Sequence, residues 1–218
     1  MNSKLPYRYI AIEGNIGAGK TSLAKIIATK FNTELVLEAF ADNTFLPQFY
    51  EQPERYAFPL EMSFLAERYQ QLKQEQEIAF ANNRPLVADY IFEKSMLFAK
   101  VNLTRHELDL FRKFYELLNT NLQRPDLILF LKKDTDTLLN NISKRGRDYE
   151  KLIPATYLDN VTKEYLTHLY SIPEERILIV ESNAIDFVED PSHLRYLLQL
   201  VQTEHQPGVH SITFDKKQ

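Results

Sequence analysis

The sequence of 218 residues contains no cysteine, which excludes disulfide bonds and metal sites built from thiolates. It also lacks an apolar run long enough to span a bilayer, and residues 1–6 lack the pattern of a signal peptide. Positive charge is not in excess, since 26 Lys and Arg stand against 30 Asp and Glu. Nucleic acid and membranes are therefore not the expected partners, and we expect a protein of the cytoplasm.

What the sequence does contain is typical of a globular protein. Hydrophobic residues make up 44% and charged residues 26%, and the length suits one domain with a sizeable core. We find no internal repeat, low-complexity tract or interdomain linker. The expected organisation is a single domain over residues 1–206, followed by a polar tail over residues 207–218.

One glycine-rich stretch matches the phosphate-binding pattern G-x-x-x-x-G-K-[ST]. Its glycines let backbone N–H groups turn inward around phosphate oxygens, its lysine supplies a point charge, and its threonine hydroxyl can bind Mg²⁺. The residues of this expected nucleotide site are Gly14, Asn15, Ile16, Gly17, Ala18, Gly19, Lys20 and Thr21.

The flanks of this stretch support a phosphate loop. Tyr7–Ile12 is a β-branched and aromatic run typical of a buried strand, and apolar residues from Leu23 to Phe31 have helical spacing. A loop between a strand and a helix offers the positive N-terminal end of the helix to an anion. A glycine turn followed by a chance lysine is the alternative, and the two flanks make it the weaker one.

Along the chain, apolar strands alternate with helical patterns, which predicts βαβ units. The fold class is therefore α/β, a three-layer α/β/α arrangement with a five-stranded parallel sheet, and the site is expected at the carboxyl ends of the strands. The expected strands are Tyr7–Ile12, Glu34–Glu38, Pro85–Asp89, Asp126–Leu131 and Arg176–Glu181. The expected later helices are Glu54–Ala81, one beginning near Phe92, Thr104–Leu118 with a capping box, Asp134–Gly146, Tyr157–Tyr170 and Pro191–Gln202, with 41–52 irregular.

Three acids, Glu38, Asp89 and Glu181, fall at the ends of expected strands. Phosphoryl transfer needs a metal-binding acid and a group that orients or deprotonates the acceptor oxygen, and strand-end carboxylates suit both roles. The alternative is that they are solvated turn acids, and it fits Glu181 better than the other two.

Basic residues close the helix that ends near Gly146. Arg145 and Arg147 are the candidates for a short lid over about 145–153, because the planar guanidinium fork suits phosphate oxygens. Cations are also favoured at a helix C-terminus by the helix dipole, so this spacing alone leaves both interpretations open.

The long expected helix carries a polar pair, Glu61 and Arg68, with Phe64 between them. Seven residues of helix put the pair on one face, about 10 Å apart along the axis. This arrangement would suit a pocket for a nucleobase, but ion pairs on the helix surface account better for the spacing taken alone.

Together these motifs resemble the deoxyribonucleoside kinase family, and bacterial deoxyguanosine kinases in particular. The resemblance covers about residues 9–180, and its motifs other than the phosphate loop are individually weak. It rests on Gly14–Thr21, Leu37-Glu38, Phe49–Tyr56, Leu60-Glu61-Met62, Arg68, Ala88-Asp89-Tyr90 and Arg145–Glu150.

The resemblance implies ATP and Mg²⁺ as cofactors, a small deoxynucleoside as substrate, and a homodimer. Glu38 would be the base at the 5′-hydroxyl, and Thr21 and Asp89 would hold Mg²⁺. Lys20, Arg145 and Arg147 would act on the phosphates. The other implied substrate-binding residues are Tyr50 and Glu150 at the sugar 3′-hydroxyl and Glu61, Arg68, Phe64 and Phe92 around the base.

The sequence departs from the family pattern at two positions. Many members have an arginine where Tyr90 stands, so its phosphate contact is lost or supplied from elsewhere. Many also have an arginine where Asn141 stands, so the lid is expected to carry one cation fewer. Neither departure removes the metal-binding acid or the base.

Glu61 stands where many relatives carry glutamine. An ionised carboxylate offers only acceptors, which fits the N1–H and N2 amine of guanine or the N1–H of hypoxanthine, whereas an amide fits adenine. We therefore predict a preference for deoxyguanosine over deoxyadenosine, with a deoxyadenosine kinase or a broader kinase as the alternative.

Other classes use the same phosphate loop. A regulatory GTPase would need D-x-x-G and N-K-x-D motifs, and the sequence has neither. A nucleoside monophosphate kinase would need more arginines for an acceptor phosphate. A non-catalytic nucleotide-binding module would follow if Tyr90 and Asn141 mark decay.

For the homodimer, apolar Met96, Leu97, Phe111 and Phe114 on the helices after Phe92 are candidate contacts, and they could equally be core.

Overall fold

The computed structural model describes residues 5–39 and 43–214. Its strands are β1 (Tyr9–Gly14), β2 (Glu34–Val36), β3 (Leu86–Ala88), β4 (Leu127–Lys132), β5 (Arg176–Glu181) and β6 (Gly208–Thr213). Its α-helices are α1 (Lys20–Phe31), α2 (Phe45–Glu51), α3 (Pro53–Ala81), α4 (Lys94–Asn102), α5 (Arg105–Asn119), α6 (Thr135–Arg145), α7 (Ala155–Ser171) and α8 (Pro191–Gln202). A 3₁₀ helix, η1 (Asp148–Leu152), follows α6. Within the described residues, no helix has the length and apolar character needed to cross a bilayer.

The strands form one parallel sheet in the order β2-β3-β1-β4-β5-β6. Every residue of β1 is buried, because the central strand is covered on both faces. The prediction of an α/β fold with a parallel sheet is confirmed, but the predicted number of five strands is wrong, since the sheet has six.

The additional strand, β6, lies within residues 207–218, which the sequence led us to expect as a tail. It pairs with β5 from Arg176↔Gly208 to Glu181↔Thr213. As an edge strand it is only partly buried, with Val209 and Ile212 packed against the core. Its mixed polar sequence therefore gives no buried apolar run that would have predicted a strand.

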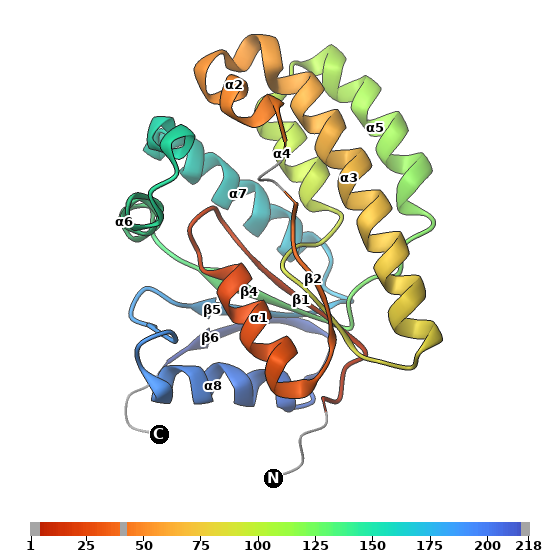
Figure 1. The fold of residues 1–218 in the computed structure, drawn as a ribbon, viewed down its shortest axis with the longest axis vertical. Helices are drawn as coiled ribbons and strands as arrows, with labels where there is room; N and C mark the ends of the chain where they lie inside the picture. The colour runs from red at the N-terminus through yellow and green to blue at the C-terminus, as the bar shows by residue number, and fades with distance from the viewer. Residues whose placement is uncertain (1–4, 40–42, 215–218) are drawn as a thin grey trace.

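Helices cover both faces of the sheet (Figure 1). On one face α1 and α8 pack against alternate residues of β1 and its neighbours, including Ile10 and Ile12. On the other face α4 and α7 pack against residues such as Ala11 and Phe130, and α3 and α5 extend the layer beyond β2 and β3. The predicted three-layer arrangement is therefore confirmed.

Two local predictions about helices are confirmed and one turns out differently. The stretch 41–52, expected to be irregular, contains α2; residues 41 and 42 lie outside the described residues. The capping box at Thr104 is confirmed, because the Glu107 carboxylate accepts from the Thr104 backbone N–H at 2.9 Å. Gly146 ends α6 with φ of 73°, as its expected role as a C-terminal cap requires.

Candidate active site

The phosphate loop joins β1 to α1, as predicted, and its glycines are required by its shape. Gly17 has φ of 83°, and a Cβ at this position would lie 2.9 Å from the Leu138 carbonyl oxygen. The Asn15 side chain donates to the Leu158 carbonyl at 2.7 Å, which fixes the loop against α7. Asn141, where the family pattern has an arginine, donates to the Gly17 carbonyl at 2.8 Å and so supports the loop.

Lys20 begins α1 and reaches back across the loop, where its ammonium donates to the Asn15 carbonyl at 2.9 Å. Burial, and after it the positive charge of Lys94, lower the pKa of Lys20 to about 8 against the opposing effect of nearby carboxylates. A phosphate bound in the loop would place negative charge beside this ammonium and would therefore favour its charged form.

The two residues predicted to hold a metal ion lie next to each other. The Thr21 hydroxyl donates to Asp89 Oδ2 at 2.5 Å, and the other oxygen of Asp89 accepts from the Glu38 backbone N–H at 2.8 Å. A hydroxyl and a carboxylate are the hard oxygen ligands that Mg²⁺ accepts together with water and phosphate oxygens. The donor set therefore fits Mg²⁺, although within the described residues no cluster of three or more metal-binding side chains forms a closed site.

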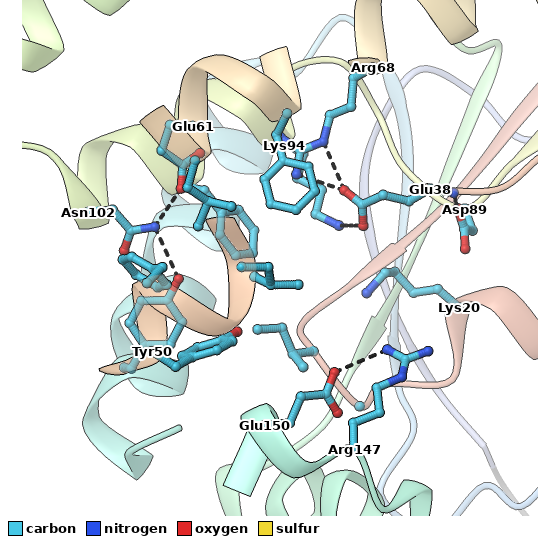
Figure 2. A pocket seen from close by; sticks show the side chains of 18 of the residues that line it. Lys20, Glu38, Tyr50, Glu61, Arg68, Asp89, Lys94, Asn102, Arg147 and Glu150 are labelled. Carbon is cyan, nitrogen blue, oxygen red and sulfur yellow. Dashed lines mark hydrogen bonds and ion pairs between the residues drawn. The ribbon is translucent and has the colours of Figure 1, made fainter. Parts of the chain in front are cut away.

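The Glu38 carboxylate lies two residues beyond the end of β2, between two cations (Figure 2). Its Oε1 accepts from Arg68 Nε at 2.9 Å and pairs with Arg68 Nη2 at 2.7 Å, while its Oε2 accepts from Lys94 Nζ at 2.5 Å. Burial alone would raise the pKa of Glu38, but the charges of Lys94 and Arg68 outweigh it and hold the pKa far below its ordinary value.

Arg68, which the resemblance placed near the base, pairs with Glu38. Its guanidinium donates to Glu38 and, from Nη1, to the Ser95 hydroxyl at 3.0 Å. It also stacks over the Phe64 ring at 4.7 Å from the centroid. Both Arg68 and Phe64 line the same pocket as Glu38. The arrangement fixes the orientation of the Glu38 carboxylate.

Glu61 projects from α3 into this pocket, and its two oxygens differ. Oε1 accepts from the Asn102 side chain at 2.6 Å, whereas Oε2 is buried without a hydrogen-bond partner. Burial raises the pKa of Glu61 to about 7, although Arg68 and Asn102 oppose the change. A buried oxygen without a donor costs free energy, so it points to a ligand that supplies one.

The pocket around Glu61 has aromatic walls. Phe98 of α4 and Tyr157 of α7 line it with Phe49, Tyr50 and Phe64. Phe92, which the resemblance implied near the base, does not line this pocket: it stacks on Tyr115 at 5.1 Å between α3 and α5. The chain turns between β3 and α4, and this turn directs Phe92 away from the pocket while Phe98, within α4, faces it.

The lid arginines meet Glu150 over the pocket. Arg145 donates to both Glu150 oxygens, at 2.9 and 2.6 Å, and Arg147 donates to one of them at 3.1 Å. Glu150 is 5% exposed and lines the same pocket as Tyr50, whose ring stacks on Tyr149 at 6.2 Å. The structure thus brings the predicted lid and sugar residues together.

Outside the pocket, Glu181 pairs with Lys132 at 2.6 Å and is partly exposed, as expected of a solvated strand-end acid. The sequence reasoning overlooked Lys94, Phe98, Asn102 and Tyr157, which also line the pocket. Only Lys94 had a usable signal, because a lysine five residues after a strand-end acid falls in the first turn of the next helix.

The chain is similar to known proteins. The family model described as deoxynucleoside kinase matches residues 10–205. A deoxyguanosine kinase of Bacillus subtilis is 38% identical over 188 residues, which cover 84% of this chain and 91% of the relative. A deoxyadenosine kinase of Dictyostelium discoideum is 33% identical over 200 residues, 91% of this chain and 79% of the relative.

A solved structure agrees with the sequence relatives. The deoxyadenosine kinase from M. mycoides with products dCMP and a flexible dCDP bound has a TM-score of 0.76 and 25% identity, covering 88% of this chain and 98% of that chain. The phosphate loop, the parallel sheet and the share of the chain that is matched therefore all indicate the same family. On these grounds the chain belongs to the deoxynucleoside kinase family.

Proposed function

We propose that this ATP-dependent deoxynucleoside kinase transfers the γ-phosphoryl group of ATP to the 5′-hydroxyl of a purine deoxynucleoside, with deoxyguanosine preferred. The observation that carries the transfer is that the phosphate loop and Glu38 face one pocket, so donor and acceptor would meet there. The observation that carries the base preference is that Glu61 Oε2 is buried and accepts no hydrogen bond from the protein.

In the proposed mechanism Glu38 binds the 5′-hydroxyl and aims its oxygen at the γ-phosphorus. The O5′–P bond forms as the bond from phosphorus to the bridging oxygen breaks, and ADP keeps that electron pair. The hydroxyl proton passes to the Glu38 carboxylate. Lys20, Arg145 and Arg147 offset the negative charge on the transferring group, which is the main task of such a site.

The proposal includes Mg²⁺, for which Thr21 and Asp89 have suitable oxygens. When bound, the ion supplies positive charge that neutralises the donor phosphates. Tyr50 and Glu150 are proposed to hold the sugar, supported by their shared position over the pocket. Because such a kinase needs ATP, we also propose that it acts in the cytoplasm.

For the base, guanine would supply N1–H to Glu61 Oε2. Most of the named relatives support a purine, since they are deoxyguanosine and deoxyadenosine kinases, and one is named as a deoxyadenosine/deoxycytidine kinase. Above about pH 7, where Glu61 is ionised, it cannot donate to N1 of adenine, and a mismatch of this kind costs about 1–3 kcal/mol. That corresponds to a preference for deoxyguanosine of roughly tenfold to a hundredfold.

A panel of acceptors with ATP and Mg²⁺ tests the proposal. We expect deoxyguanosine to have the highest kcat/KM, followed by deoxyadenosine, with dGMP not phosphorylated. Turnover of dGMP in place of deoxyguanosine would instead make the chain a nucleoside monophosphate kinase. Absence of turnover with every acceptor would leave only a nucleotide-binding module.

We also propose a homodimer formed through the outer face of α5. Leu110, Phe114 and Leu117 recur at helical spacing on this face and are 45%, 43% and 71% exposed. Of the residues considered from the sequence, Leu97 and Phe111 are buried in the core and Met96 packs against it, so Phe114 alone remains a candidate contact. An apolar row of this kind suits a second copy of the same helix.

A further inference from the structure

A lysine that the sequence analysis did not consider lies at the centre of the site. Lys94 is the first residue of α4 and is 5% exposed, although lysine is rarely buried unless it is paired. Its partner is Glu38, whose Oε2 lies 2.5 Å from Lys94 Nζ. Figure 2 shows the Lys94 ammonium pointing at the Glu38 carboxylate, beside the Arg68 guanidinium.

The position of Lys94 bears on what replaces the arginine that many relatives have in place of Tyr90. Tyr90, where many relatives have an arginine, is 0% exposed and donates its hydroxyl to Gln71 at 2.8 Å. Its ring packs in the core with residues of the sheet and α3, and Tyr90 does not line the pocket that holds Lys20. After residues 91–93 the chain turns into α4. The side chain of its first residue, Lys94, lines the pocket and carries a positive charge.

Lys94 also stands near the groups that would act on phosphate. It lines the same pocket as Lys20, Thr21 and Asp89, and the charges of Lys94 and Lys20 are close enough to repel each other. The other oxygen of Glu38 is already held by Arg68. A 5′-oxygen bound to Glu38 and facing a phosphoryl group held by Lys20 would therefore lie beside the Lys94 ammonium.

We propose that Lys94 is a further catalytic residue, whose ammonium contacts the oxygens of the transferring phosphoryl group and supplies the charge that an arginine at position 90 would supply. This inference rests on the proposed kinase function. Lys94 keeps its proton throughout, since the hydroxyl proton goes to Glu38 and the electron pair of the broken bond leaves with ADP. Its contribution is electrostatic and is greatest when negative charge spreads over the transferring oxygens.

Two neutral variants and one charged variant test Lys94. Lys94→Met removes the charge at nearly constant length, Lys94→Gln keeps a hydrogen-bond donor for Glu38 without the charge, and Lys94→Arg keeps the charge. Lys100→Met is the control, because Lys100 lies on the same helix with a 39% exposed side chain and a weak 3.8 Å pair to Glu164. Each variant is measured for kcat, for KM with ATP and with deoxyguanosine, and for its melting temperature.

We expect both neutral variants to lower kcat about a hundredfold to a thousandfold. KM for ATP should change little, because the donor phosphates remain bound by the loop, and Lys94→Arg should recover at least tenfold of the lost rate. A lysine that only holds Glu38 in place predicts instead that Lys94→Gln is as fast as Lys100→Met. If Lys94→Met fails to fold, Lys94→Gln decides the question by itself.

The wild-type enzyme separates this inference from the proposed function. If the wild type phosphorylates no deoxynucleoside, the proposed function fails before Lys94 is considered. If it does so and both neutral variants keep the rate of Lys100→Met, the kinase function stands and the role of Lys94 is overturned.

Discussion

At the scale of single residues, the first prediction concerns the role of Glu38 as the base. Glu38→Gln keeps the size of the side chain but cannot accept the hydroxyl proton. We expect kcat to fall about a hundredfold to ten-thousandfold, while the dissociation constant for ATP stays nearly unchanged because the phosphate loop is intact. Single-turnover rates and equilibrium nucleotide binding measure the two effects.

The matched control is Glu34→Gln. Glu34 lies on β2 and pairs with Arg84 at 2.5 Å outside the pocket, so its replacement should leave kcat within about twofold of wild type. A Glu38→Gln enzyme with the rate of this control would assign the base to another residue.

Glu61 carries the second prediction, which concerns the base. In Glu61→Gln the amide can donate to N1 of adenine and accept from its N6 amine, so the ratio of kcat/KM for deoxyguanosine over deoxyadenosine should fall about tenfold to a hundredfold. Glu67→Gln is the control, since Glu67 on the same helix accepts from the Ser63 hydroxyl outside the pocket. An unchanged ratio would remove Glu61 from base recognition.

The same residue predicts a dependence of stability on pH. The pKa of Glu61 is about 7 in the folded protein against 4.5 for the unperturbed group. Between these values the unfolded chain has lost the proton that the folded protein retains, so rising pH destabilises the fold through this window. The penalty is absent below pH 4.5, grows up to about pH 7 and is constant above it, at on the order of 3 kcal/mol.

Glu61→Gln should remove this penalty. We expect its free energy of unfolding to exceed that of wild type at pH 8 and to match it below pH 4.5, as measured by denaturant titration without nucleoside. A variant that is no more stable at pH 8 would mean that the buried carboxylate is not destabilising. Together with a lowered preference for deoxyguanosine, the gain would show that base recognition is maintained at the expense of stability.

At the scale of elements, the lid offers the next prediction. Arg145 holds Glu150 with two hydrogen bonds and Arg147 with one, and both arginines line the same pocket as the phosphate loop. Arg145→Ala should lower kcat on the order of a hundredfold, because one cation facing the transferring group is lost. Lys151→Ala is the control, since Lys151 pairs with exposed Asp148 in the same segment. Equal rates for the two variants would argue against a phosphate role for Arg145.

The elements also show what the sequence was able to predict. β1, β4 and β5 are continuous apolar runs, and the glycine pattern between β1 and α1 is specific to phosphate loops when a strand precedes it and a helix follows. The sheet and the phosphate loop were therefore predictable. β6 was not, because an edge strand buries little and its residues are mixed.

The site could be predicted only where position along the chain was enough. Glu38 and Asp89 follow strands, and the carboxyl ends of neighbouring parallel strands meet, so their proximity follows from topology. Whether Phe92 or Phe98 faces the pocket, and that Lys94 reaches Glu38, depend on how α4 is rotated after the turn at residues 91–93. Local sequence does not set that rotation, because packing against α3, α5 and α7 determines it.

At the scale of the whole molecule, the outer face of α5 lies far from the chemistry. Leu110, Phe114 and Leu117 do not line the pocket, so a substitution on this face tests assembly without removing a pocket side chain. If α5 forms the dimer, light scattering after size exclusion should give twice the chain mass of 25.6 kDa for the wild type. Phe114→Glu should give the monomer, because it places a charge in the middle of the apolar row.

Lys113→Glu is the matched control, since it makes a charge change at an exposed neighbouring position outside that row. It should remain dimeric. Because Phe114 is 43% exposed, its replacement should not open the core, so monomeric Phe114→Glu should keep a melting transition and a kcat close to wild type. Loss of kcat together with loss of the dimer would mean that the partner supports the pocket, through α4 and its Lys94 and Asn102, which lie between α5 and the site.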